Sequence, residues 1–337
     1  MATERVLVDS YGRRIASLRI SLTDRCNFRC VYCTPPEGFS VTPKPEYLTR
    51  DEVVRIVRIM GRYGVGRVRL TGGEPLLRDD IVEIVAAVRA VETVEEVSIT
   101  TNASRLAALA VPLKGAGLDR LNISLDSLDE SRFARVARTA QYARVMEGID
   151  AAIDAGFPVK VNVVVLKGMT DEEIVDFVAM AVRRDIEVRF LEFMPLCGDG
   201  WQADLVYPIG GVRDVVTRRF DLLEEERGDR TAQTFAIAGG GRVGFIGSLS
   251  EPFCNACSRV RISADGRIRP CLFSGYEVPL RELMRDGASD DAIVGAIRTA
   301  VANKSRGNQF VEAPFREESA QSQVVSGGEP LIRRVGG

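Results

Sequence analysis

Two groups of three cysteines are the residues of this chain that could hold a metal centre. The first group is Cys26, Cys30 and Cys33. Three ligands leave one position open, as in a catalytic site, whereas a structural zinc site usually has four protein ligands. Thiolates select zinc, copper or iron–sulfur clusters. We expect an open metal centre here. The alternatives are a zinc loop with a distant fourth ligand, or buried thiols, and the chain has no histidine to serve as that ligand.

The second group is Cys254, Cys257 and Cys271. A four-thiolate zinc site is the main alternative here, because Cys197 could complete it; otherwise we interpret Cys197 as structural or incidental. Arg259 and Arg261 follow the second cysteine and share one face of a predicted strand. Cations beside an open metal position predict a bound anionic substrate.

Polar side chains also lie near the ends of five predicted strands. Solvated rim residues would explain any one of them, but inward-facing Arg and Lys are costly unless an anion pairs with them. Arginine forks match phosphate oxygens, so the set predicts a polyphosphate. Its members are Arg19 with Ser21, Arg69 with Thr71, Asn122 with Ser124, Lys160 with Asn162, and Arg189.

The stretch Thr71-Gly72-Gly73-Glu74-Pro75 joins a strand to a helix. Two glycines allow the backbone to approach a ligand closely, and Glu74 could accept hydrogen bonds from it. Alone, the stretch could equally be a tight turn.

Strand and helix patterns alternate through residue 193, which predicts an α/β fold with a parallel sheet. A partial barrel fits best, because a doubly wound sheet would carry a Gly-x-Gly-x-x-Gly turn after its first strand. The predicted strands are 15–22, 67–70, 96–100, 120–124, 159–166 and 187–193, and the predicted helices are 49–63, 79–91, 106–114, 142–155 and 172–183.

From Cys197 onward the pattern changes to turns, hairpins near residues 238–241 and 260–269, and helices at 212–220, 280–286 and 291–303. We predict a barrel domain over 1–196, a second subdomain over 197–316, and a flexible tail over 317–337.

Composition predicts a globular protein of the cytoplasm. The 337 residues are 45% hydrophobic and 27% charged, with a net charge of −2. No strongly basic surface for nucleic acid is expected, and neither a membrane span nor a signal peptide is visible. Cysteines in the cytoplasm stay reduced, which favours metal binding over disulfides.

The spacing Cys-x3-Cys-x2-Cys with Tyr32 before the last cysteine resembles the radical S-adenosylmethionine (SAM) superfamily, as does Gly-Gly-Glu-Pro. The C-terminal Cys-x2-Cys-x13-Cys and the terminal Gly336-Gly337 narrow the resemblance to the GTP 3′,8-cyclase family of molybdenum cofactor biosynthesis. It implies a partial (βα)6-type TIM barrel, a smaller C-terminal iron–sulfur subdomain that closes the barrel, SAM, and two [4Fe-4S] clusters.

The resemblance also implies roles for residues. Cys26, Cys30 and Cys33 would hold the cluster that binds SAM, and the second cysteine group would hold a cluster that binds the substrate. The remaining assignments are Tyr32, Gly73, Ser124 and Met194 for SAM; Arg19, Arg69, Thr100, Lys160, Arg189, Arg259, Val260 and Arg261 for GTP; and Arg259, Arg261, Gly336 and Gly337 for catalysis.

The implied reaction converts GTP to (8S)-3′,8-cyclo-7,8-dihydro-GTP after a 5′-deoxyadenosyl radical removes the C3′ hydrogen. Implied partners are a one-electron reductant such as flavodoxin or ferredoxin and the downstream cyclic pyranopterin monophosphate synthase, and the resemblance leaves room for a homodimer. Two residues depart from the family pattern: Ala103, where glycine is common, and Val335, where isoleucine is usual.

Two other functions stay open at this point. One is a radical SAM enzyme that modifies a peptide with the help of an auxiliary cluster. The other is a non-catalytic metal-binding or electron-transfer protein, for which four cysteine ligands are expected at each centre.

Overall fold

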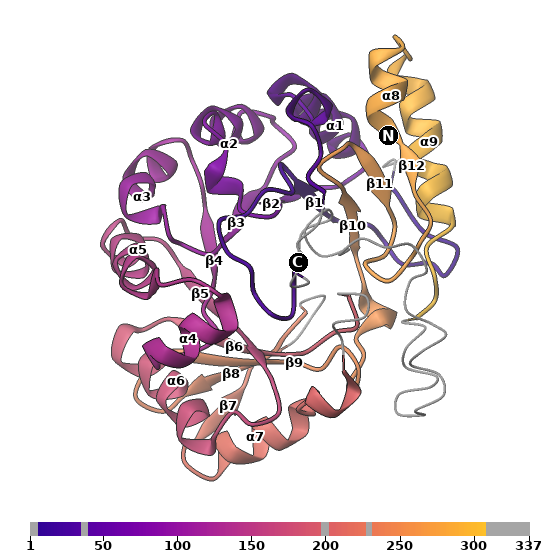
Figure 1. The fold of residues 1–337 in the computed structure, drawn as a ribbon. Coiled ribbons are helices and arrows are strands. Elements are labelled where there is room, and N and C mark those ends of the chain that lie inside the picture. Colours follow the sequence, from indigo (N-terminus) through magenta and orange to yellow (C-terminus); the bar gives the residue numbers. More distant parts are fainter. Residues whose placement is uncertain (1–5, 35–39, 197–201, 227–230, 308–337) are drawn as a thin grey trace.

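Strands and helices alternate along the first part of the chain, as the sequence predicts (Figure 1). The structure is a computed structural model that describes residues 6–34, 40–196, 202–226 and 231–307. Its strands here are β1 (Ser17–Ser21), β2 (Arg67–Thr71), β3 (Glu96–Thr101), β4 (Arg120–Ser124), β5 (Val159–Val165) and β6 (Glu187–Glu192). The helices are α1 (Arg50–Gly61), α2 (Ile81–Arg89), α3 (Leu106–Gly115), α4 (Glu130–Ala137), α5 (Tyr142–Asp154) and α6 (Asp171–Arg184).

The later elements join the same sheet instead of forming another within the described residues. They are α7 (Ile209–Thr217), β7 (Leu222–Glu224), β8 (Gln233–Ile237), β9 (Arg242–Ile246), β10 (Arg259–Ile262), β11 (Arg267–Arg269), β12 (Val278–Pro279), α8 (Leu280–Arg285) and α9 (Asp290–Ala302). The order across the twelve-stranded sheet is β12-β11-β10-β1-β2-β3-β4-β5-β6-β9-β8-β7. The later strands therefore extend both edges of the sheet.

The strands from β10 across to β9 run parallel to one another, and the outer pairings β10–β11, β11–β12, β9–β8 and β8–β7 are antiparallel. The sheet curves around an interior, with helices on its outer side (Figure 1). Together with the fold neighbours described below, this confirms the predicted partial barrel. Such a sheet gathers the carboxyl ends of its strands at one mouth, where barrel enzymes bind substrates. The predicted boundary at residue 196 stays a prediction.

Helix α1 shows how local sequence fixes the outer layer. Thr49 and Glu52 form the predicted capping box, and the stripe Val53, Ile56 and Met60 is fully buried against the sheet. Burial of each such side chain contributes roughly 1.5–3 kcal/mol. Thr170 and Glu173 repeat the capping box at the start of α6.

Helix α4 is absent from the predicted elements. It is only eight residues long, and Asp129 caps it by accepting a hydrogen bond from the backbone N–H of Arg132. Its apolar face consists largely of Phe133, whose ring packs edge-on against Phe28 with centroids 6.0 Å apart. Eight residues make only about two turns, which is shorter than the stretch over which an apolar period identifies a helix.

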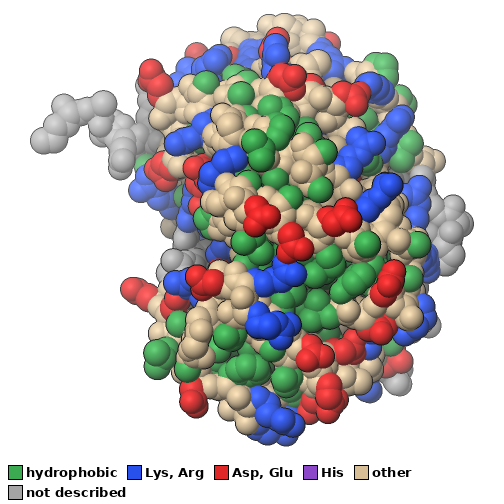
Figure 2. Space-filling view, turned by 90° about the vertical axis from the view of Figure 1, so that its left-hand side faces the viewer, with side chains coloured by type: hydrophobic (Ala, Val, Ile, Leu, Met, Phe, Trp, Pro, Cys, Tyr) green, Lys and Arg blue, Asp and Glu red, His purple; other side chains and the backbone are tan. Residues whose placement is uncertain are grey.

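The surface view in Figure 2 shows basic and acidic side chains interspersed. This face has no broad field of one sign, in keeping with the net charge of −2. Within the described ranges, no helix combines the length and apolarity that crossing a membrane requires.

Ala103 occupies a conformation that favours glycine. It follows β3 with a φ of 62°, is fully buried, and its carbonyl oxygen lies close to Gly148. A left-handed conformation costs a non-glycine residue roughly 1–2 kcal/mol. The departure from the family pattern therefore falls on a strained residue.

We expect Ala103→Gly to change the free energy of unfolding by less than about 1 kcal/mol. Relief of strain is offset by roughly 0.4–1 kcal/mol of unfolded-chain entropy and by about 0.8 kcal/mol for one buried methyl group. Urea denaturation measures the difference. The matched control is Ala110→Gly, because Ala110 is also buried but lies within α3. Its backbone is helical, so no relief of strain offsets the destabilisation. Equal destabilisation of the two variants would contradict the strain argument.

Candidate active site

Neighbouring elements hold the first cysteine group in place. Its loop follows β1, and the backbone N–H groups of Arg29 and Val31 donate to the carbonyls of Ala137 and Val136 at the end of α4. The last carbonyls of a helix have no partner within the helix, so α4 offers them to the loop. Cys26, Cys30 and Cys33 are all partly exposed and line one cavity.

The Gly-Gly-Glu-Pro stretch braces the same loop. The N–H of Gly73 donates to the carbonyl of Thr23 at 2.6 Å, and the N–H of Glu74 donates to that of Arg25 at 2.7 Å. A side chain on Gly73 would meet the Arg25 carbonyl at 2.3 Å. The glycines thus allow close approach of two backbones, while Gly72 and Gly73 still line the cavity.

Glu74 does not turn toward that cavity. It is 1% exposed, and its oxygens accept hydrogen bonds from Leu76 N, Thr101 Oγ1 and Asn102 N. Burial raises the pKa of Glu74 to about 7 despite these bonds. The expectation that Glu74 could receive a ligand finds no support in this geometry, because its own chain uses both oxygens.

Asp126, which is buried, and Tyr32, which is half-buried, form a pair beside the first cysteines. The Tyr32 hydroxyl donates to Asp126 Oδ2 at 2.6 Å, and Val164 N donates to Oδ1 at 3.0 Å. Burial raises the pKa of Asp126 to about 6. Asp126 therefore fixes the ring of a residue predicted to contact SAM.

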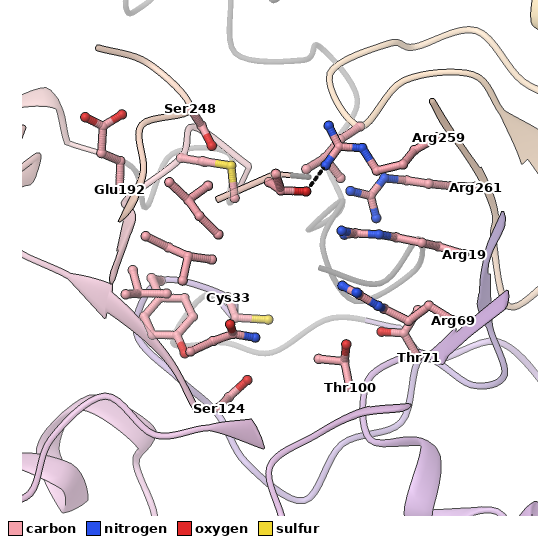
Figure 3. A pocket seen from close by; sticks show the side chains of 18 of the residues that line it. Arg19, Cys33, Arg69, Thr71, Thr100, Ser124, Glu192, Ser248, Arg259 and Arg261 are labelled. Carbon is pink, nitrogen blue, oxygen red and sulfur yellow. Dashed lines mark hydrogen bonds between the residues drawn. The ribbon is translucent and has the colours of Figure 1, made fainter. Parts of the chain in front are cut away.

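A row of arginines forms another wall of the cavity. In the sheet, Arg19 on β1 is paired with Arg261 on β10 and with Arg69 on β2. Figure 3 shows these three guanidinium groups and that of Arg259 pointing into the cavity, across from Ser124 and Cys33. Arg19 is 9% exposed and Arg261 is 7% exposed.

Burial and mutual repulsion disfavour the charge on these arginines. Burial, followed by Arg189, lowers the pKa of Arg69 to about 9, and burial with Arg259 lowers that of Arg261 to about 10. For Arg19, burial and Arg261 lower the pKa well below its usual value. A bound polyanion would reverse all three shifts, because opposite charge favours the protonated form.

The second cysteine group lies on the same cavity, next to Arg259. Cys254, Cys257 and Cys271 are partly exposed, and Arg259 Nη2 donates to Cys257 Sγ at 3.5 Å. Burial opposes ionisation of Cys257, but Arg259 and then Lys304 prevail and lower its pKa to about 6. This thiol is thus prepared to act as an anionic ligand.

The cysteine arrangement fits clusters better than single ions. No three His, Cys, Asp or Glu side chains of the described part of the chain form a site for one metal ion. In a four-iron cluster each thiolate binds a different iron, so the thiols need to border a space instead of meeting at a point. The zinc alternative with Cys197 cannot be followed, since that residue lies outside the described residues.

Two polar atoms at paired positions of the sheet lack partners among the described residues, and one of them, Thr100 Oγ1, belongs to a residue that borders the cavity. Over the described ranges, Thr100 Oγ1 and Asn122 Oδ1 are buried without a hydrogen-bond partner. They belong to directly paired residues of β3 and β4. Buried polar groups are normally satisfied, so a ligand or water is expected to supply the missing bonds.

Most of the predicted site residues border the cavity. These are the six cysteines, Tyr32, Gly73, Ser124, Met194, Arg19, Arg69, Thr100, Arg189, Arg259 and Arg261. Val260 is fully buried in the core, and Gly336 and Gly337 lie outside the described residues.

Lys160 lies elsewhere. It lines a second hollow, together with Glu96, Arg120 and Glu187. Glu187 accepts hydrogen bonds from both Lys160 and Arg189. Arg189 borders the main cavity, whereas Lys160 and Glu187 line the second hollow. Burial and then Arg189 lower the pKa of Lys160 to about 8.

Three cavity residues were missed by the sequence reasoning. Asp126 could have been found, because it follows Ser124 by two residues at a strand end. Asn102 directly follows β3 and donates to Asn27 Oδ1 and, at 3.8 Å, to Cys26 Sγ. Lys304 follows the last described helix, and no local pattern marks it.

Comparison with known proteins gives two family matches. Residues 20–181 match the Radical SAM superfamily, and residues 186–310 match Molybdenum Cofactor Synthesis C. The chain is 43% identical to GTP 3′,8-cyclase of Streptomyces coelicolor over 96% of each chain, and 40% identical to that of Listeria monocytogenes over 98% of each.

Some relatives are longer. The chain is 44% identical to molybdenum cofactor biosynthesis protein 1 of Bos taurus over 89% of its own length, but it spans only 48% of that protein. Among solved structures, SuiB of Streptococcus suis bound to its precursor peptide SuiA has a TM-score of 0.62 at 17% identity, covering 90% of this chain and 73% of SuiB. This likeness concerns the fold alone.

Because the thiolate is the reactive form, Cys257 and Cys30 should differ in reactivity. Burial, followed by the charge of Asp126, raises the pKa of Cys30 well above its usual value. We expect iodoacetamide to label Cys257 in cluster-free protein with a midpoint near pH 6, and Cys30 only in strongly alkaline solution. Peptide mass spectrometry under anaerobic conditions measures both.

Arg259→Met serves as the matched variant, since it removes the guanidinium beside Cys257. In this variant the midpoint for labelling of Cys257 should rise toward about pH 8.5, the usual pKa of cysteine. Similar labelling of Cys257 and Cys30 across the pH range would contradict the electrostatic difference.

Proposed function

The chain belongs to the GTP 3′,8-cyclase family of the radical SAM superfamily, and we propose that it converts GTP to (8S)-3′,8-cyclo-7,8-dihydro-GTP. This reaction is the first step of molybdenum cofactor biosynthesis. One observation carries the proposal: two groups of three cysteines border one cavity that also contains a buried row of arginines.

The cofactors of the family are SAM and two [4Fe-4S] clusters. Cys26, Cys30 and Cys33 would hold one cluster, and Cys254, Cys257 and Cys271 the other. When bound, the first cluster with SAM supplies the radical chemistry that removes the C3′ hydrogen of GTP.

The protein's own residues bind and orient the reactants. Tyr32, Gly73, Ser124 and Met194 are proposed to contact SAM. Arg19, Arg69 and Arg189 are proposed to bind the phosphates, because planar guanidinium groups match phosphate oxygens. Arg259 and Arg261 would orient the nucleotide at the second cluster, with Gly336 and Gly337 near the reacting atoms.

Several finer assignments belong to the same proposal. They are a reductant such as flavodoxin or ferredoxin, delivery of product to cyclic pyranopterin monophosphate synthase, a cytoplasmic location, a homodimer, and the domain limits 1–196, 197–316 and 317–337. A peptide substrate is less consistent with the site, because a row of arginines in the cavity favours a polyanion over a neutral ligand.

Anaerobic incubation of the reconstituted protein with SAM, GTP and a strong reductant tests the function. We expect about eight irons per chain, as two four-iron clusters require, and a cyclised product that appears only with GTP. Formation of 5′-deoxyadenosine without that product would overturn the assignment. Zinc in place of iron, or intact SAM, would favour the electron-transfer alternative.

Lys160 is expected to act on GTP through Glu187. In Lys160→Met the Glu187 carboxylate keeps its ion pair with Arg189 but loses the one with Lys160. The Arg189 guanidinium is then bound more tightly to Glu187 and is less available to a phosphate. GTP affinity should fall about tenfold, which is about 1.4 kcal/mol and slightly less than the roughly 1.5–3 kcal/mol of a hydrogen bond to a charged group. Lys160→Met combined with Glu187→Gln should regain most of the loss, because both charges are then removed.

Isothermal titration calorimetry with GTP, and with guanosine as the phosphate-free control, measures these effects. Guanosine binding should be unchanged in both variants. If the double variant binds GTP no better than Lys160→Met, Lys160 contacts the phosphates directly and the relay through Glu187 is wrong.

A further inference from the structure

Lys304 is a buried cation at the second cysteine group. It follows α9 and is 3% exposed. Its Nζ donates to the carbonyl of Arg259 at 2.8 Å and to that of Pro270 at 2.6 Å. These bonds show that the side chain is fixed in one position.

The two carbonyls belong to the two segments that carry cysteines of this group. Arg259 begins β10, two residues after Cys257, and Pro270 directly precedes Cys271. One ammonium group therefore ties both segments together at their strand ends.

Cys254, the remaining cysteine of the group, is linked through Arg13 to the residues that follow Lys304. Arg13 Nη1 donates to the Cys254 carbonyl at 2.8 Å and to the Arg306 carbonyl at 2.9 Å, and Nη2 donates to the Ser305 carbonyl. The stretch 304–306 thus contacts every arm of the cysteine group, directly or through Arg13.

The charges of these two cations are balanced differently. Arg13 forms an ion pair with Asp9 at 2.6 Å. Lys304 forms no ion pair with a carboxylate of the described residues. Burial lowers the pKa of Lys304, and the ionised thiols of Cys257 and Cys271 oppose this effect.

A buried lysine needs compensation, since carbonyl dipoles alone offset only part of the desolvation cost. An anionic centre formed by thiolates would supply it. Nearby charge and hydrogen bonding set the reduction potential of iron–sulfur clusters, and a cation favours the reduced form because reduction adds negative charge.

We propose that Lys304 is a positioning residue of the second cluster, which holds two of its cysteine segments and raises its reduction potential. The inference rests on the cluster and on no step of GTP cyclisation, so its test is independent of turnover.

The test compares the holoprotein with Lys304→Met and Lys304→Arg. Lys114→Met is the matched control, because Lys114 also donates to a carbonyl, that of Gly156, but lies on the outer side of the barrel. The readouts are iron per chain and the midpoint potential of each cluster, followed by electron paramagnetic resonance. The first cluster is recognised as the one whose signal changes on addition of SAM.

In Lys304→Met we expect the ratio of reduced to oxidised second cluster to be at least tenfold lower at a fixed potential. This corresponds to a midpoint potential lowered by about 59 mV for a one-electron couple. The first cluster should be unchanged. Lys304→Arg and Lys114→Met should match the unaltered protein. Selective loss of four irons from Lys304→Met, with retention in Lys304→Arg, would equally support the proposal.

The proposal would be overturned if Lys304→Met kept all its iron and the midpoint potential of its second cluster were unchanged. If Lys304→Met loses both clusters, Lys304→Arg decides: recovery of both clusters supports a role for the charge. Loss of both in Lys304→Arg as well would overturn the proposal, leaving Lys304 as a residue of the fold.

Discussion

Three adjacent parallel strands each place an arginine in one row of the barrel interior, and the rest of the site depends on this arrangement. Sheet pairing brings Arg261, Arg19 and Arg69 next to one another, although like charges opposite each other in a sheet are destabilising. The aliphatic layer between sheet and helices supplies the stability that tolerates this repulsion. A polyanion in the cavity removes it, so the fold is organised for a ligand of high negative charge.

The charge balance changes along the barrel axis. Around the second hollow, cations are joined to carboxylates: Arg120 to Glu96, and Lys160 to Glu187. Arg189, which borders the main cavity, shares Glu187 with Lys160. Carboxylates paired with cations therefore lie at the second hollow, whereas the main cavity presents a row of arginines to a nucleotide.

Much of this site was predictable, because cysteine spacing and polar residues at strand ends are local signals. The height of a residue along the barrel axis was not predictable. Alternation along β5 assigns Lys160 to the interior face, but it does not show whether the side chain reaches the main cavity or the second hollow. Glu74 illustrates another limit, since its hydrogen-bond partners Thr101 and Asn102 come from a different strand. Helix α4 and Lys304 were missed because their importance arises from distant residues that only the folded chain brings into contact.

Both cysteine groups lie in segments with little regular structure, so their geometry comes from braces elsewhere in the chain. The first is held by the end of α4 and by Gly73, the second by Arg13 and Lys304. These braces form only once the sheet has assembled, which couples metal binding to folding. Because β1 and β10 pair directly, the two groups share one rigid support while each keeps its own brace. A change at one brace can therefore alter one centre without moving the other.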